Sequence, residues 1–286
     1  MDSTRTRDLR TVVARIGYLA EGEGPARYRA YPPASGRSTE TPPKRYHEMP
    51  IHDCRPVAGE LSLDVEGFAV VRQASPIRDF YDDELVRREY YPEVERLMRE
   101  ATGALAVFAF DHNVRSAKAA TEARPGIREP VDMAHNDYTE SSGPRRAREI
   151  LEQRGHGDLV GNRAALVNAW RPIRGPVQDV PLTICEAGST APSDFVPTSI
   201  EHFGGDDLSR PRHSGEIFSF RHRPEHRWFY VSDMQPDEVL LLKCFDTRKQ
   251  GGARYTAHTG FANPECPPGF TPRQSIEVRT LVVFAG

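Results

Sequence analysis

From residue 162 to the C-terminus, the sequence is a succession of short apolar segments that Pro, Gly and Asp separate. These segments are residues 163–173, 180–185, 215–221, 227–233, 238–246, 253–261 and 275–284. Short runs rich in β-branched and aromatic residues, bounded by turn residues, are typical of strands. A long series of such strands favours a double-sheet jelly-roll barrel. We therefore expect a mainly β core.

The chain before residue 162 predicts the elements that flank this core. Residues 1–50 are rich in Arg, Pro, Ser and Gly, which predicts an extended N-terminal arm, and residues 51–286 are expected to form a single domain. The other expected elements are a strand at Leu61–Gln73, a helical stretch at Ile77–Thr102 interrupted near Pro92, a buried strand at Ala104–Asp111, a loop at Arg115–Pro130 and a short helix at Pro144–Arg154. The fold class is thus mainly β with flanking helices.

The composition narrows the class of partner. The chain has 286 residues, of which 41 are acidic and 38 basic, so its net charge is only -3 and no basic face for nucleic acid is indicated. No apolar run approaches the ~18 to 20 residues that a bilayer span needs, and the N-terminus is polar. The four cysteines form no Cys-x-x-Cys pair and are expected to be reduced. We expect a cytoplasmic protein that acts on a small molecule, and the oligomeric state is left open.

His135 and Asp137 are two residues apart in a short polar segment. On an extended backbone, residues i and i+2 point to the same side, so both side chains can bind one ion. His258 lies in a predicted C-terminal strand, and a barrel can bring it to the same place. Two histidines and one carboxylate cover one face of a ferrous ion and leave the other face for a co-substrate and dioxygen. These three residues therefore indicate a catalytic iron site.

A group of polar residues with strand spacing follows His258. Arg273, Ser275, Glu277 and Arg279 alternate along the last predicted strand, so all four are expected to face one side. An arginine there can bind the distal carboxylate of 2-oxoglutarate through two parallel hydrogen bonds, which a lysine cannot match. Arg273 has the better context because Ser275 can reach the same carboxylate. Arg279 is the alternative, and either arginine can instead pair with a carboxylate of the protein.

His222 and His226 offer a competing metal site with i, i+4 spacing. Such a pair binds zinc well on a helix, but Pro224 lies between the two histidines, and the glutamate of a metalloprotease motif is missing. A solvated turn before the strand at residues 227–233 is the preferred interpretation.

Residues 168–182 form a long and unusual block, Asn-Ala-Trp-Arg-Pro-Ile-Arg-Gly-Pro-Val-Gln-Asp-Val-Pro-Leu. This block resembles a hallmark of the AsaB-like hydroxylase/desaturase family, which includes CmcJ of cephamycin 7-methoxylation and fungal gibberellin desaturases. Further matching segments occur in family order, and they are residues 135–139, 237–246, the segment around His258, and residues 273–279. Together they cover about residues 60–284, which is far more specific than a His-x-Asp motif alone.

The resemblance implies a double-stranded β-helix, cupin-like core and an oxygenase that depends on Fe(II) and 2-oxoglutarate. It implies that His135, Asp137 and His258 are the iron ligands and that Arg273 or Arg279 anchors 2-oxoglutarate. Oxidative decarboxylation of this co-substrate with dioxygen would drive removal of hydrogen from a C–H bond, followed by hydroxylation, desaturation or ring formation. By analogy with the family, the substrate is a secondary metabolite. The rivals are an iron oxygenase that does not use 2-oxoglutarate and a non-catalytic accessory barrel.

Three residues near these motifs are candidates for supporting roles. Arg171 either bridges strands or points inward at a carboxylate, and Asn168 offers a donor and an acceptor on the side of its strand that Trp170 shares. Tyr138, beside the metal pair, can orient a ligand. Substrate contacts are expected from the N-terminal arm and from loops at residues 113–130 and 187–215, because loops on a rigid scaffold usually carry specificity.

Overall fold

The fold consists of two β-sheets and of helices that pack against the smaller sheet. The computed structural model describes residues 8–22, 25–32, 35–116, 127–204 and 207–286. In spatial order, the nine-stranded sheet contains β1 (Thr11–Leu19), β3 (Lys44–Asp53), β12 (Trp228–Tyr230), β9 (Leu182–Cys185), β14 (His258–Gly260), β7 (His135–Asn136), β11 (His213–Phe220), β10 (Phe195–His202) and β2 (Arg27–Ala30). The six-stranded sheet contains β4 (Phe68–Arg72), β13 (Glu238–Asp246), β8 (Ala164–Arg174), β15 (Gln274–Val283), β5 (Ala106–Ser116) and β6 (Ile127–Arg128). The predicted mainly β, jelly-roll class is confirmed.

The inner faces of the two sheets meet in an apolar core. Trp170, Leu240 and Leu242 from the six-stranded sheet pack in one cluster with Ile184 and Phe229 from the nine-stranded sheet. Because side chains alternate along a strand, the remaining residues of β8 and β13 point to the other face of their sheet. The six-stranded sheet therefore has a second face to cover.

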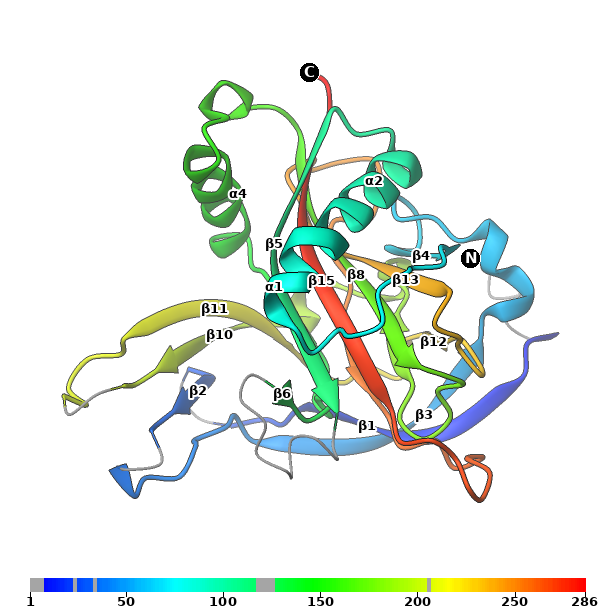
Figure 1. The fold of residues 1–286 in the computed structure, drawn as a ribbon. Coiled ribbons are helices and arrows are strands. Elements are labelled where there is room, and N and C mark those ends of the chain that lie inside the picture. The colour runs from blue at the N-terminus through cyan, green and yellow to red at the C-terminus, as the bar shows by residue number, and fades with distance from the viewer. Residues whose placement is uncertain (1–7, 23–24, 33–34, 117–126, 205–206) are drawn as a thin grey trace.

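A helical layer that includes α2 covers that outer face. Figure 1 shows α2 (Tyr91–Thr102) lying across β15, β8 and β5. Val94 and Met98 of this helix share a cluster with Val167 of β8 and Leu241 of β13. A second helix, α4 (Ser142–Gln153), packs on the opposite, inner side of the sheet, where its apolar cluster includes Leu166 of β8 and Leu281 of β15. The central strand β8 is consequently buried on both faces, which holds its inward side chains in fixed positions.

The long helical stretch differs in detail from the prediction. It runs without a break from α1 (Asp83–Leu85) through a π-helical turn at Val86–Tyr90 into α2. Pro92 is the second residue of α2 and has no N–H to donate to the preceding turn, and the π-helical turn stands directly before this helix. The proline thus marks a change of helical register, not the predicted interruption.

The N-terminal segment and one predicted loop contain strands. Residues 11–19 and 44–53 pair with each other as β1 and β3, and β3 continues the sheet by pairing with β12, so much of the expected arm is part of the domain. The expected loop at residues 187–215 contains β10, which lies between β11 and β2. Pro197 weakens the strand signal of that segment because proline has no N–H to donate. Part of the predicted loop at residues 113–130 lies outside the described residues.

Among the residues that the structure describes, no helix has both the length and the apolar character that crossing a bilayer requires.

The contact between the sheet and α2 predicts a large loss of stability when it is truncated. Leu241 is fully buried in that contact, so Leu241→Ala is expected to lower the free energy of unfolding by about 2 to 5 kcal/mol in urea titrations. The matched control is Leu105→Ala, because Leu105 is 54% exposed, and its change should stay within about 0.5 kcal/mol. Equal effects of both substitutions would contradict this account of the core.

Candidate metal centre

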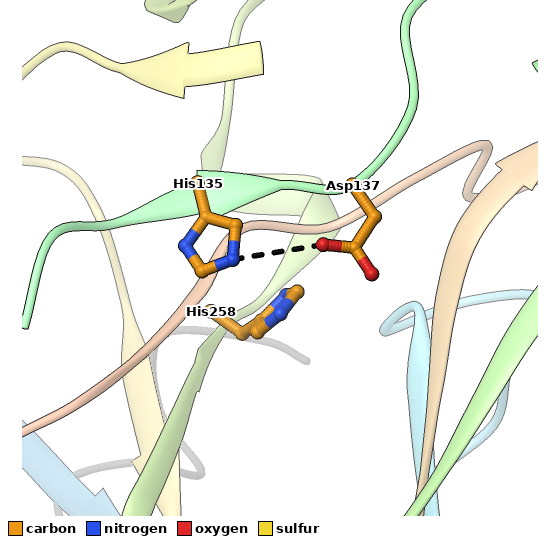
Figure 2. A group of neighbouring side chains, drawn as sticks. All are labelled: His135, Asp137 and His258. Carbon is orange, nitrogen blue, oxygen red and sulfur yellow. Dashed lines mark ion pairs between the residues drawn. The ribbon is translucent and has the colours of Figure 1, made fainter. Parts of the chain in front are cut away.

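His135, Asp137 and His258 converge in the interior between the sheets. β7 pairs with β14 so that His135 stands directly opposite His258, and Asp137 follows β7 immediately. One ligand atom from each of the three side chains lies within 4.8 Å of the others. Figure 2 shows the His135 ring directed at the Asp137 carboxylate, with His258 approaching from a separate strand. The structure therefore brings together the three residues that the sequence singled out.

Neighbouring groups fix the orientation of two of these side chains. Nδ1 of His135 hydrogen-bonds the carbonyl oxygen of Met133 at 2.9 Å, which leaves Nε2 facing Oδ1 of Asp137 at 3.6 Å. The other carboxylate oxygen, Oδ2, accepts hydrogen bonds from Asn168 Nδ2 at 2.9 Å and from Arg279 Nε at 3.0 Å. Each of these contacts leaves one ligand atom directed at the shared space.

The protonation states at this site suit metal binding. Burial, followed by the neighbouring His258, lowers the pKa of His135 to about 4. Burial alone would raise the pKa of Asp137, but Arg279 and the two histidines outweigh it and hold that pKa well below its usual range. At neutral pH the site therefore contains neutral imidazoles and an ionised carboxylate, the forms that bind metals. In addition, the buried Nδ1 of His258 has no hydrogen-bond partner among the described residues.

Arg273 is a buried cation next to this group. Its Nη1 donates to the carbonyl oxygen of Val180 at 2.8 Å, its Nε donates to Ser275 Oγ at 3.3 Å, and its guanidinium lies 5.0 Å from the ring centre of Trp170. Burial, and then the positive charge of Arg115, lower its pKa to about 9. Within the described part of the chain, no carboxylate forms an ion pair with it. A buried guanidinium in this state is suited to an anionic ligand.

Arg279 is engaged differently. Besides Asp137, it donates from Nη1 to Asp111 Oδ2 at 2.8 Å, and its Nη2 lies 3.6 Å from Glu277 Oε1. The donors of its guanidinium are therefore already engaged by protein carboxylates. Of the two arginines that the sequence offered as a carboxylate anchor, Arg273 is the one whose geometry fits that role.

Arg171 does not join the site. Its Nη2 donates to the backbone oxygen of Gln73, and its guanidinium lies 5.3 Å from the ring centre of Tyr90 in the helical layer. Since Arg171 follows Trp170 on β8 and Trp170 faces the interior, Arg171 must point to the outer face. The sequence left two alternatives for Arg171. The alternative in which its side chain points inward at a carboxylate is wrong, and its contacts with Gln73 and Tyr90 favour a role in packing.

Two cavities meet at His135 and Asp137. A small one is lined by Trp170, Arg273, Glu277 and His258, among others. A large one of about 1150 Å³ opens on the other side between α4, the β10–β11 hairpin and the N-terminal segments, and Tyr138 contributes to its wall. Such a volume suits a small-molecule ligand of considerable size. Both cavities reach His135 and Asp137.

Arg115 lines both cavities and was not among the predicted site residues. The sequence predicts a strand that ends near Asp111 and a loop that contains Arg115, whereas β5 extends to Ser116. In the observed register Arg115 stands opposite Ser275 of β15, so the two side chains share the inner face. The sequence signal that could have identified Arg115 is its even spacing from Asp111. That spacing places both side chains on one face only if the strand continues to Arg115.

The competing histidine pair has a structural role. His226 Nε2 lies 3.0 Å from Asp194 Oδ2, and the His222 ring stacks on His47 with ring centres 3.7 Å apart. Within the described residues, the one group with metal-ligand spacing is that of His135, Asp137 and His258.

Comparisons with known proteins agree with this geometry. A family model described as YDMC, an oxidoreductase/YMDC permease-like domain, matches residues 16–283. The hydroxylase/desaturase efuI of Hormonema carpetanum is 32% identical over 84% of this chain and 85% of its own length. The Fe(II)/2-oxoglutarate-dependent dioxygenase nvfI of Aspergillus novofumigatus is 30% identical over 84% of each chain. This chain belongs to the hydroxylase/desaturase family of Fe(II)/2-oxoglutarate-dependent dioxygenases.

A solved structure extends the family relationship to the fold. A variant of the iron and alpha-ketoglutarate-dependent endoperoxidase NvfI superposes with a TM-score of 0.82 at 25% identity, over 97% of this chain and all of the other. The predicted family, the jelly-roll fold and the oxidoreductase class are confirmed by these matches.

The contact between Asn168 and Asp137 generates a prediction about metal affinity in this family member. Asn168→Ala removes one of the two donors that hold Asp137, and loss of such a contact typically weakens metal binding about 10- to 100-fold. Titration of the metal-free protein with Co²⁺, followed by its visible spectrum, measures the change. Asn162→Ala is the control, since Asn162 bonds the backbone oxygen of Phe284 away from the site. Unchanged Co²⁺ affinity in Asn168→Ala would show that Asp137 is oriented without this residue.

Proposed function

We propose that His135, Asp137 and His258 hold the ferrous ion of this dioxygenase and that Arg273, with Ser275, anchors 2-oxoglutarate. The observation that carries the proposal is the buried Arg273 guanidinium, which has no carboxylate partner among the described residues and lines the same small cavity as the three ligand residues. Desolvating a charge without compensation is costly, so a site of this kind is built for an anion that arrives from outside.

Each residue then has a defined task. His135, Asp137 and His258 would hold the ion through one ligand atom each and would leave room for the co-substrate and dioxygen. Arg273 and Ser275 bind the distal carboxylate, where a planar guanidinium adds directional hydrogen bonds to the charge attraction. Trp170 forms an apolar wall against Arg273 and limits water near the anchor. When bound, iron and 2-oxoglutarate supply an oxidant that removes hydrogen from a C–H bond.

The substrate is a small molecule that binds in the large cavity. Support comes from the position of that cavity, which reaches His135 and Asp137 from the side opposite the anchor and includes Tyr138. The related proteins carry names such as hydroxylase/desaturase and alpha-ketoglutarate-dependent dioxygenase, which supports oxidation of a C–H bond in a secondary metabolite. Hydroxylation, desaturation and ring formation all start from this common step.

Anaerobic titration tests the ligand set. The metal-free protein receives Fe²⁺ and then 2-oxoglutarate, and the weak visible charge-transfer band of the chelate is recorded. We expect the band in the wild type and its loss in His258→Ala, which lacks one of the three ligands. His213→Ala is a matched control, because His213 lines the large cavity away from the triad. Absence of the band in the wild type would overturn the proposal, and release of product without succinate would favour an oxygenase that does not use 2-oxoglutarate.

The same band decides the anchor. In Arg273→Ala the ion still binds, but the 2-oxoglutarate concentration for half-saturation should rise on the order of 100-fold, because a buried charge pair loses one partner. In Arg171→Ala it should not change, since Arg171 faces the helical layer. An undiminished response to 2-oxoglutarate in Arg273→Ala would assign the anchor to another residue.

A further inference from the structure

Arg279 connects the candidate iron ligand to a row of carboxylates. It lies on β15 and reaches Asp137 Oδ2 through Nε at 3.0 Å and Asp111 Oδ2 through Nη1 at 2.8 Å. Its Nη2 lies 3.6 Å from Glu277 Oε1. One guanidinium therefore faces three acidic side chains, only one of which belongs to the ligand group.

The two carboxylate oxygens of Asp137 have different contacts. Oδ2 accepts two hydrogen bonds, one from Arg279 and one from Asn168 at 2.9 Å. Oδ1 is the oxygen nearest His135, whose Nε2 lies at 3.6 Å. Holding Oδ2 in this way leaves Oδ1 directed at the histidines. The aspartate is thus oriented before an ion arrives.

The charge of Arg279 has a second effect. A fixed positive charge beside a ligand of the metal repels Fe³⁺ more strongly than Fe²⁺, since the interaction scales with the charge of the ion. Asn168 makes an equivalent hydrogen bond to the same oxygen but carries no charge. Both donors orient the Asp137 carboxylate, but only Arg279 adds a positive charge. Substituting each donor separately therefore distinguishes the effect of orientation from the effect of charge.

We infer that Arg279 is a positioning residue that holds Asp137 and, through its charge, keeps the bound iron in the ferrous state. The inference rests on the proposed ligand set. A dioxygenase of this class needs ferrous iron at the start of each cycle, and its site is exposed to dioxygen, which withdraws electrons. Arg279 counteracts this loss by making removal of one electron from the ferrous ion less favourable.

Redox titration of the iron-loaded protein without co-substrate tests the inference. Soluble mediators accept one electron from each ferrous ion, no bond is formed or broken in the protein, and the ferric fraction is followed by electron paramagnetic resonance. In Arg279→Met the ferric-to-ferrous ratio at a fixed potential should rise about tenfold or more, equivalent to a fall of about 59 mV or more in midpoint. Arg279→Lys keeps the charge and should restore most of the wild-type ratio. Asn168→Ala should change it by less than about threefold, because an amide has no net charge.

Each outcome has a defined meaning. If the wild type forms no 2-oxoglutarate-dependent band, the proposed function fails before this test begins. If the wild type forms the band but Arg279→Met leaves the ratio unchanged, or Arg279→Lys behaves as Arg279→Met does, the inference is overturned while the function stands. Arg279→Gln replaces Arg279→Met if the latter does not fold, with the same expected direction.

Discussion

The pairing of β7 with β14 is the interaction on which the site depends. These strands are short, yet their register sets His135 opposite His258 and brings Asp137 to the same point. β7 also pairs with β11, and β14 with β9, so both strands are held from two sides in the middle of the nine-stranded sheet. A shift by one residue would turn each histidine to the other face of the sheet. The ligand geometry is thus a property of the sheet and not of a flexible loop.

The six-stranded sheet supplies the charged residues that surround this pair. Asn168, Arg273 and Arg279 all project from its inner face, next to the apolar core that Trp170 and Leu240 help to form. The buried charge of Arg279 is tolerated there because it is paired with Asp137 and Asp111. The helical layer on the outer face keeps β8 and β15 rigid, so it contributes to the site without touching it. Packing on the outer face of the sheet in this way holds the polar side chains of the inner face in position.

Periodicity explains what the sequence could predict. His135 and Asp137 share a side because they are two residues apart, and the alternation from Arg273 to Arg279 correctly identified the inward face of the last strand. The same rule explains why Arg171 lies elsewhere, since it is adjacent to the inward Trp170. What alternation does not supply is the length of a strand or its partners. For that reason the sequence predicts irregular segments for Arg115, for the strands before residue 54 and for β10. The sequence also could not distinguish Arg273 from Arg279, because their contacts with Val180 and Asp111 depend on how the strands pair.

The spacing of the two arginines accounts for their different tasks. Arg273 immediately precedes β15 and Arg279 lies within it six residues later, which at about 3.3 Å per residue separates their backbones by about 20 Å. One side chain cannot serve both ends of that distance. Arg279 reaches Asp137 at one end, and Arg273 stands at the other with Ser275 beside it, while Glu277 and Arg115 flank the space between them. Arg273, the arginine remote from Asp137, is therefore the one of the two that has no carboxylate partner among the described residues, and an anion that enters the small cavity would find its donors available.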